Sequence, residues 1–100
     1  MGVKLPADQL QLYEGIDEIL WIDWDPIGIS GNDWARDEYQ GYLPQVFQLA
    51  LAGASPLKIA EYLNEIVSDR MGLRSSVDQH LRVATTIRDL KLRLILKSAR

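Results

Sequence analysis

The chain has 100 residues, of which 47% are hydrophobic and 25% are charged, and its formal net charge is −3. This composition is typical of one globular domain covering residues 1–100 and excludes an intrinsically disordered chain. The absence of cysteine excludes disulfide bonds and thiolate metal sites, and no apolar run approaches the ~20 residues that span a bilayer.

Residues 7–23 are predicted to form the first helix. Their apolar side chains recur at helical spacing, at Leu12, Tyr13, Ile16, Ile19 and Leu20. Glycine costs a helix about 1 kcal/mol relative to alanine, so we expect Gly15 to let another helix approach closely. The helix has to end near Trp24, because Asp25 precedes Pro26 and the residue before a proline avoids helical geometry.

A structured loop is predicted over residues 24–33. Asp25, Pro26, Ile27 and Gly28 match the preferences of a type I turn, with Asp first, Pro second and Gly fourth. The loop region is rich in side chains that are costly to leave in water, namely Trp24, Ile27, Ile29 and Trp34. We therefore expect the loop to fold back on the body and to be a structural device.

A second helical stretch is predicted to begin between Asp33 and Asp37 and to end at Gly53. Asp33, Asp37 and Glu38 would place negative charge at its N-terminus, as the helix dipole prefers. Pro44 lies inside this stretch and removes one backbone hydrogen bond. Two structures remain open: a helix kinked at Pro44, or a short turn followed by a helix that starts at Pro44.

The third helix has the clearest boundaries, with Ser55 as N-cap, Pro56 in the first position and Gly72 as a left-handed C-terminal cap. The fourth is predicted to run from Ser75 or Ser76 to Ser98. Residues 90–94 alternate with period two, but no partner strand is evident and their side chains favour a helix. The sequence thus predicts an all-α, irregular four-helix domain with a structured aromatic loop between helices 1 and 2.

No recognisable catalytic apparatus is present. His80 is the sole histidine, and neither a G-x-S-x-G elbow nor a phosphate-binding glycine loop occurs, so we expect no catalytic residues, no metal, no cofactor and no enzyme activity. Asp23 and Asp25 do not begin a calcium-binding loop, because Trp34 occupies the twelfth position counted from Asp23, where such a loop has a glutamate. A small-ligand or metal site is kept as an alternative, built from the acidic loop residues and a neighbouring tyrosine, Asp25, Asp37, Glu38 and Tyr39.

Charge is divided unevenly along the chain. Residues 1–68 hold three basic and eleven acidic residues, a net −8, whereas residues 69–100 hold eight basic and three acidic residues, a net +5. A nucleic-acid site is therefore a second alternative, using Arg82, Arg88, Lys91, Arg93 and Lys97. We disfavour it, because nucleic-acid-binding domains usually carry an overall basic excess.

Protein binding is the function that the sequence favours. The candidate partner-binding residues are the aromatic and acidic side chains Trp34, Asp37, Glu38, Tyr39 and Tyr42. For the three aromatic residues the alternative is packing, and for the two acidic residues it is a role at the helix N-terminus. The last helix is apolar around much of its circumference, which predicts a homodimer interface at Leu92, Leu94, Ile95 and Leu96. Residues 1–6 lack the apolar stretch of a signal peptide, so we expect a cytoplasmic protein without membrane contact.

The segments W-D-P-I-G (residues 24–28) and D-E-Y (residues 37–39) resemble a family of small uncharacterised bacterial proteins. In that family a W-D-P-I-G turn is followed about ten residues later by D-E-Y at a helix start. The resemblance extends loosely over residues 10–75 and implies an all-α fold and a bacterial, cytoplasmic origin. It supplies no activity, and a role as an immunity or antitoxin partner follows by analogy alone.

Overall fold

The computed structural model describes residues 5–98, and the side chains of residues 5–96. Within this range all the regular elements are helical, which confirms the all-α fold. In chain order they are α1 (Ala7–Glu18), η1 (Ile19–Trp24), η2 (Asp33–Ala35), α2 (Leu43–Leu51), α3 (Pro56–Glu65), η3 (Ile66–Arg70) and α4 (Asp78–Ser98). None of the described helices is long and apolar enough to cross a bilayer. The predicted features of residues 1–4 lie outside the described residues.

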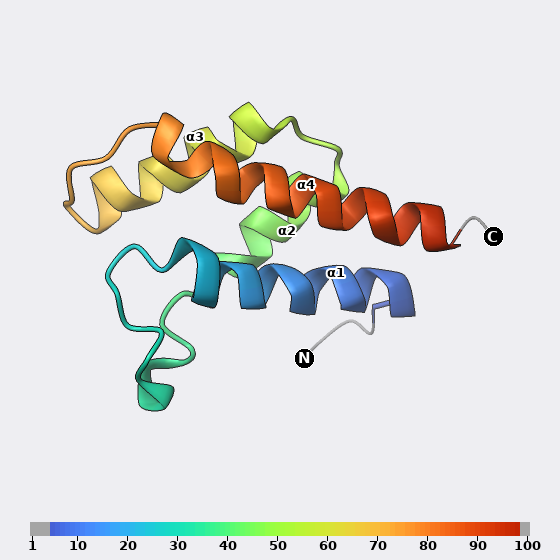
Figure 1. Ribbon diagram of the computed structural model, residues 1–100, viewed down its shortest axis with the longest axis horizontal. Helices are drawn as coiled ribbons and strands as arrows, with labels where there is room; N and C mark the ends of the chain where they lie inside the picture. Colours follow the sequence, from blue (N-terminus) through green and yellow to red (C-terminus); the bar gives the residue numbers. More distant parts are fainter. Residues whose placement is uncertain (1–4, 99–100) are drawn as a thin grey trace.

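Helix α4 is the central element of the fold. Figure 1 shows it lying between α1 and α3, and it also contacts α2. The core between these helices includes four side chains that are at most 1% exposed, from α1, α2, α3 and α4 in turn: Ile16, Val46, Leu63 and Ile87. These residues follow the helical period in each segment, so the amphipathic pattern of the sequence determines which face of each helix is buried.

Gly15 is where α1 comes closest to α4. A Cβ atom added at this position would overlap Cδ2 of Leu90, which projects from α4. The expectation that Gly15 admits a second helix is therefore confirmed, and the second helix is α4.

The predicted ends of the first and third helices are confirmed. A π-helical turn, η1, extends α1 to Trp24, and the chain then adopts a left-handed conformation at Asp25, with φ 31°. Ser55 caps α3, since its side chain accepts a hydrogen bond from Lys58 N–H at 3.2 Å. Gly72 has the predicted left-handed conformation, with φ +67°, after η3 has extended α3.

The second helix begins later than its earliest predicted start. Helix α2 starts at Leu43, so a helix beginning at Asp33–Asp37 is wrong and the alternative of a turn followed by a helix at Pro44 is right within one residue. Pro44 lies in the first turn of α2, where the missing N–H has no helical partner to lose. Asp33 starts a short 3-10 helix, η2, and turns follow it.

Helix α4 begins at Asp78, two residues after the later predicted start. The backbone N–H of Ser76 donates to Oε1 of Gln79 at 2.9 Å, which is half of a capping box. The period-two segment of residues 90–94 is helical, as predicted. Of the four residues of the predicted dimer interface, Leu94 packs against the core, as Leu90 does, whereas Leu92, Ile95 and Leu96 are exposed.

Candidate functional site

The loop after η1 is organised around the carboxylate of Asp25. Its Oδ1 accepts hydrogen bonds from Ile29 N–H at 2.8 Å and from the Tyr39 hydroxyl at 2.7 Å. Its Oδ2 accepts a third from Ser30 N–H at 3.3 Å. Burial alone would raise the pKa of Asp25, but these hydrogen bonds outweigh it and hold the pKa below its ordinary value. The predicted turn is present, because Gly28 N–H donates to the Asp25 carbonyl at 3.2 Å.

Tyr39 completes this hub from the far end of the loop. Its hydroxyl donates to Asp25 and accepts a hydrogen bond from Ile27 N–H at 3.2 Å. Burial and then the neighbouring carboxylate raise the pKa of Tyr39, so the hydroxyl stays protonated. Because Tyr39 is 2% exposed, its prediction as a partner-binding residue is corrected: the ring holds the loop from beneath.

Trp34 belongs to η2, and the segment that contains η2 projects farthest from the four long helices (Figure 1). Trp34 is 83% exposed, while Ala35 beside it in η2 is buried. The expectation that the loop packs its apolar side chains is right for Trp24 and Ile29 but wrong for Trp34 and for Ile27, which is 44% exposed. The 3-10 turn at Asp33–Ala35 can bury one side, and the alanine occupies it.

The other predicted partner-binding residues divide between the surface and the interior. Asp37 and Glu38 are exposed close to Trp34 in the sequence, as is Asp33. Tyr42 is half-buried, because its ring meets Trp24 edge to face at 6.3 Å between centroids and Arg70 covers it at 5.9 Å. The surface residues of this set are thus Trp34 with its acidic neighbours.

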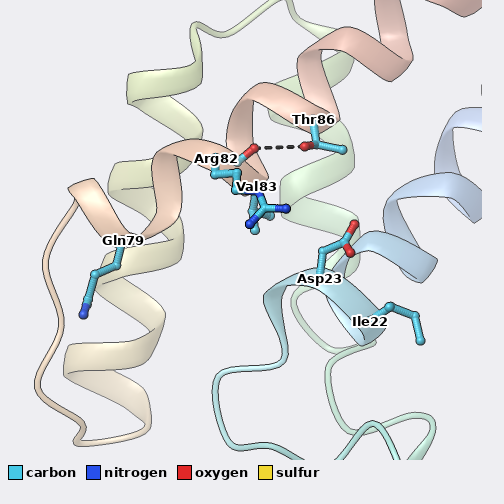
Figure 2. Close-up of a pocket in the computed structure, with 6 residues that line it drawn as sticks. All are labelled: Ile22, Asp23, Gln79, Arg82, Val83 and Thr86. Carbon is cyan, nitrogen blue, oxygen red and sulfur yellow. Dashed lines mark hydrogen bonds between the residues drawn. The ribbon is translucent and has the colours of Figure 1, made fainter.

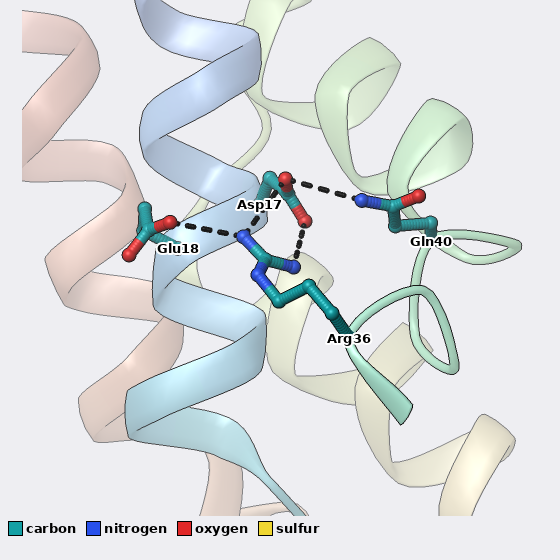
Figure 3. A network of polar contacts seen from close by, with 4 residues as sticks. All are labelled: Asp17, Glu18, Arg36 and Gln40. Carbon is teal, nitrogen blue, oxygen red and sulfur yellow. Dashed lines mark hydrogen bonds and ion pairs between the residues drawn. The ribbon is translucent and has the colours of Figure 1, made fainter. Parts of the chain in front are cut away.

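Arg36 fastens the loop to α1. Figure 3 shows its guanidinium against Asp17, with both nitrogens bonded to the carboxylate, at 3.0 and 3.1 Å, and a further contact to Glu18 at 2.9 Å. Gln40 adds a hydrogen bond to Asp17 at 3.4 Å, and the guanidinium also lies 5.3 Å from the ring centroid of Trp21. The amino-acid sequence does not predict this contact, because no local pattern pairs residues nineteen positions apart.

The other end of the loop is tied to α4 through Trp24 and His80. The Trp24 indole N–H donates to Nδ1 of His80 at 3.2 Å, and Nε2 of His80 lies 2.6 Å from the Ser75 hydroxyl. Since Nδ1 accepts, a neutral ring carries its proton on Nε2 and donates it to Ser75. Burial lowers the pKa of His80 and favours this neutral form. His80 therefore does not activate the Ser75 hydroxyl as a general base, and the contact is structural.

Two adjoining hollows lie between η1 and the N-terminal part of α4. The first, of about 330 Å³, is shown in Figure 2 and is lined by Ile22, Asp23, Gln79, Arg82, Val83 and Thr86. The second, of about 260 Å³, shares Asp23, Gln79 and Val83 and reaches Trp24, Arg74 and His80. Both ring nitrogens of His80 are already paired within the chain, so this ring is not free to bind a ligand in the second hollow.

The structure adds little support for the two alternative sites, the small-ligand or metal site in the loop and the nucleic-acid site on α4. Both carboxylate oxygens of Asp25 are engaged, and no three acidic or histidine side chains gather at a possible metal position within the described residues. On α4, Lys91 donates to the Leu51 carbonyl at 3.2 Å. Arg88 and Arg93 point about 140° apart at 3.6 residues per turn. The side chain of Lys97 lies outside the described residues.

Comparison of the chain with protein-family models, with curated proteins and with solved structures finds no match in any of the three. The resemblance to the family with the W-D-P-I-G turn stays a prediction.

Proposed function

We propose that this chain is a protein-binding domain and that residues 25–40, carrying Trp34, are its docking element. The observation that carries the proposal is the 83% exposure of Trp34 beside a well-packed core. Tryptophan, with tyrosine and arginine, is enriched among the residues that dominate binding energy at protein interfaces. Covering a solvent-exposed indole with a partner removes a large apolar surface from water, which favours binding.

The rigidity of the loop supports the same function. The Asp25 hub holds one side of the loop, and Arg36 fastens the other side to α1. A docking element that is ordered before binding loses less conformational entropy on association. We infer that the loop presents Trp34 in one orientation.

The charge around Trp34 indicates the chemistry of the partner. Asp33, Asp37 and Glu38 are exposed, and none of them forms an ion pair with any side chain in residues 5–96. A matching surface has an apolar pocket for the indole and a rim of lysine or arginine. By analogy with small acidic helical immunity and antitoxin proteins, we propose a basic protein of a bacterial cytoplasm as this partner.

Affinity capture with the tagged full chain tests the proposal. Proteins retained from a lysate of the source organism are identified by mass spectrometry, with Trp34→Ala and Leu57→Ala chains run in parallel. Leu57 is a suitable control because it is 52% exposed but belongs to α3, on the other side of the molecule from the loop (Figure 1). We expect a specific basic protein to be retained by wild type and by Leu57→Ala and lost with Trp34→Ala.

The captured protein is then purified and its affinity is measured by calorimetry. We expect Trp34→Ala to weaken binding by about 30-fold or more, as for a central hot-spot residue. Asp37→Lys with Glu38→Lys reverses two rim charges, and we expect slower association and a weaker dependence on salt. Equal retention of every captured protein by wild type and Trp34→Ala would contradict the proposed function.

A further inference from the structure

The contact between Trp24 and His80 exists in only one protonation state of the histidine. The Trp24 indole N–H donates to Nδ1 of His80, and Nε2 of the same ring is paired with the Ser75 hydroxyl. An indole is a donor only, whereas a protonated imidazole carries a hydrogen on both nitrogens and accepts nothing. Protonation at Nδ1 would set two N–H groups against each other at a side chain that is 6% exposed. The protonated ring therefore has to leave the indole.

The second hollow offers the protonated ring another position. This hollow, of about 260 Å³, is lined by His80 itself and by Asp23, Arg74 and Gln79, which are exposed, so it is open to water. Asp23 forms no ion pair with any side chain in residues 5–96. Figure 2 shows Asp23 on η1 beside α4, the helix that carries His80. A change of side-chain rotamer would bring the ring into the hollow, where water and the Asp23 carboxylate favour the imidazolium.

We propose that His80 is a pH-sensitive latch between α4 and the docking element, residues 25–40. The neutral ring accepts the Trp24 N–H and keeps the latch closed, whereas the protonated ring turns toward Asp23 and opens it. Trp24 directly precedes the docking element, so opening releases that end from α4, while Arg36 still fastens the other side to α1. The effect of opening on partner binding rests on the proposed function, but the latch itself is a property of the isolated chain.

The charged groups around His80 set the direction of the response. Asp23 on η1 favours the protonated ring and Arg74, in the segment before α4, opposes it, while the wall that η3 contributes is apolar. On α4 itself, Asp78 and Arg82 are each two residues from His80, a spacing at which helical side chains do not face each other. Burial lowers the pKa of His80 in the closed latch, so we expect opening below pH 6.5.

Nuclear magnetic resonance of the ¹⁵N-labelled full chain, between about pH 7.5 and 5, tests the latch. The chain has three tryptophans and one histidine, so the His80 ring signals are unique and Trp24→Phe identifies the Trp24 indole signal. We expect the Trp24 indole N–H signal and the His80 ring signals to shift with one midpoint, below pH 6.5. We expect the Trp21 indole signal to keep its position and the backbone spectrum to remain that of a folded chain.

Substitutions in the hollow test where the protonated ring goes. Asp23→Asn removes the carboxylate, and we expect it to lower the midpoint by a few tenths of a pH unit, the effect of an exposed pair. Arg74→Gln removes the opposing charge, and we expect it to raise the midpoint by a similar amount. Asp33→Asn is the matched control, because Asp33 is exposed in η2, outside the hollow, and we expect no change.

His80→Asn tests the role of the proton. The asparagine oxygen can take the place of Nδ1 as the acceptor for Trp24 but does not titrate, so we expect the Trp24 signal to become independent of pH. If His80→Asn does not fold, the wild-type and Asp23→Asn titrations still decide the question.

Three outcomes would overturn the proposal. The first is a Trp24 signal that does not move while His80 titrates, or a His80 ring that does not titrate in this range. The second is loss of all folded signals at the same midpoint, which indicates unfolding of the whole chain. The third is an unchanged midpoint in Asp23→Asn. None of these measurements requires a partner, so failure to capture a protein through Trp34 would contradict the proposed function and leave the latch standing.

Discussion

The Asp25–Tyr39 hub can be tested by removing one oxygen atom. In Tyr39→Phe the ring keeps its volume, so the packing against Trp21 and Trp24 is retained, at centroid distances of 6.1 and 5.4 Å. The change removes the hydrogen bond at 2.7 Å to the Asp25 carboxylate and leaves Ile27 N–H without its acceptor. A hydrogen bond to a charged group contributes about 1.5–3 kcal/mol, and an orphaned donor costs about 1–3 kcal/mol when it is fully buried.

The Asp25 carboxylate and the Ile27 N–H are only partly buried, so the loss of the two hydrogen bonds costs less than the sum of these figures. We therefore expect Tyr39→Phe to lower the free energy of unfolding by about 2 kcal/mol. Urea denaturation followed by circular dichroism measures this change, and its midpoint shift with an unchanged slope would attribute the loss to stability alone. Tyr13→Phe is a control, because Tyr13 packs edge to face on Phe47 at 5.1 Å and forms no hydrogen bond through its hydroxyl within the described residues. Equal stability of Tyr39→Phe and wild type would refute the hub as the support of the loop.

Two further substitutions test α4. Burial lowers the pKa of His80, so the ring stays neutral in the folded chain, whereas in the unfolded chain it gains a proton near pH 6.5. The contribution of His80 to the free energy of unfolding is therefore fully present above pH 6.5 and is lost as the pH falls below it. Below pH 6.5 we expect the free energy of unfolding to fall by at most about 1.4 kcal/mol per pH unit. We expect His80→Leu to remove this pH dependence. A wild-type free energy of unfolding that does not change from pH 7.5 to 5.5 would contradict a buried, neutral His80. At Gly15, alanine gains about 1 kcal/mol of helix propensity but meets Leu90. We expect Gly15→Ala to stabilise a Leu90→Ala chain by about that amount and wild type by less, as measured in a double-mutant cycle; the same gain in both backgrounds would argue against the close approach.

The amino-acid sequence by itself determined the helices and most of their ends. Ser55, Pro56 and Gly72 act through neighbouring backbone atoms, so their positions specify the ends of one helical segment without knowledge of the rest of the chain. The same is true of the Asp25–Gly28 turn. Leu90 and Leu94 were assigned to a helix correctly because propensity and the lack of a partner strand outweighed a short alternating pattern.

Tertiary structure decided which side chains of the loop are buried and which remain outside. Tyr39 and Trp34 are both aromatic residues among charges in the sequence, yet one lies beneath the loop and the other at its outermost part. The difference depends on contacts across 14 to 56 positions, from Tyr39 to Asp25 and from Trp24 to His80. No periodic or local pattern encodes such contacts, because they exist only when the packed helices have brought the two ends of the loop to their partners.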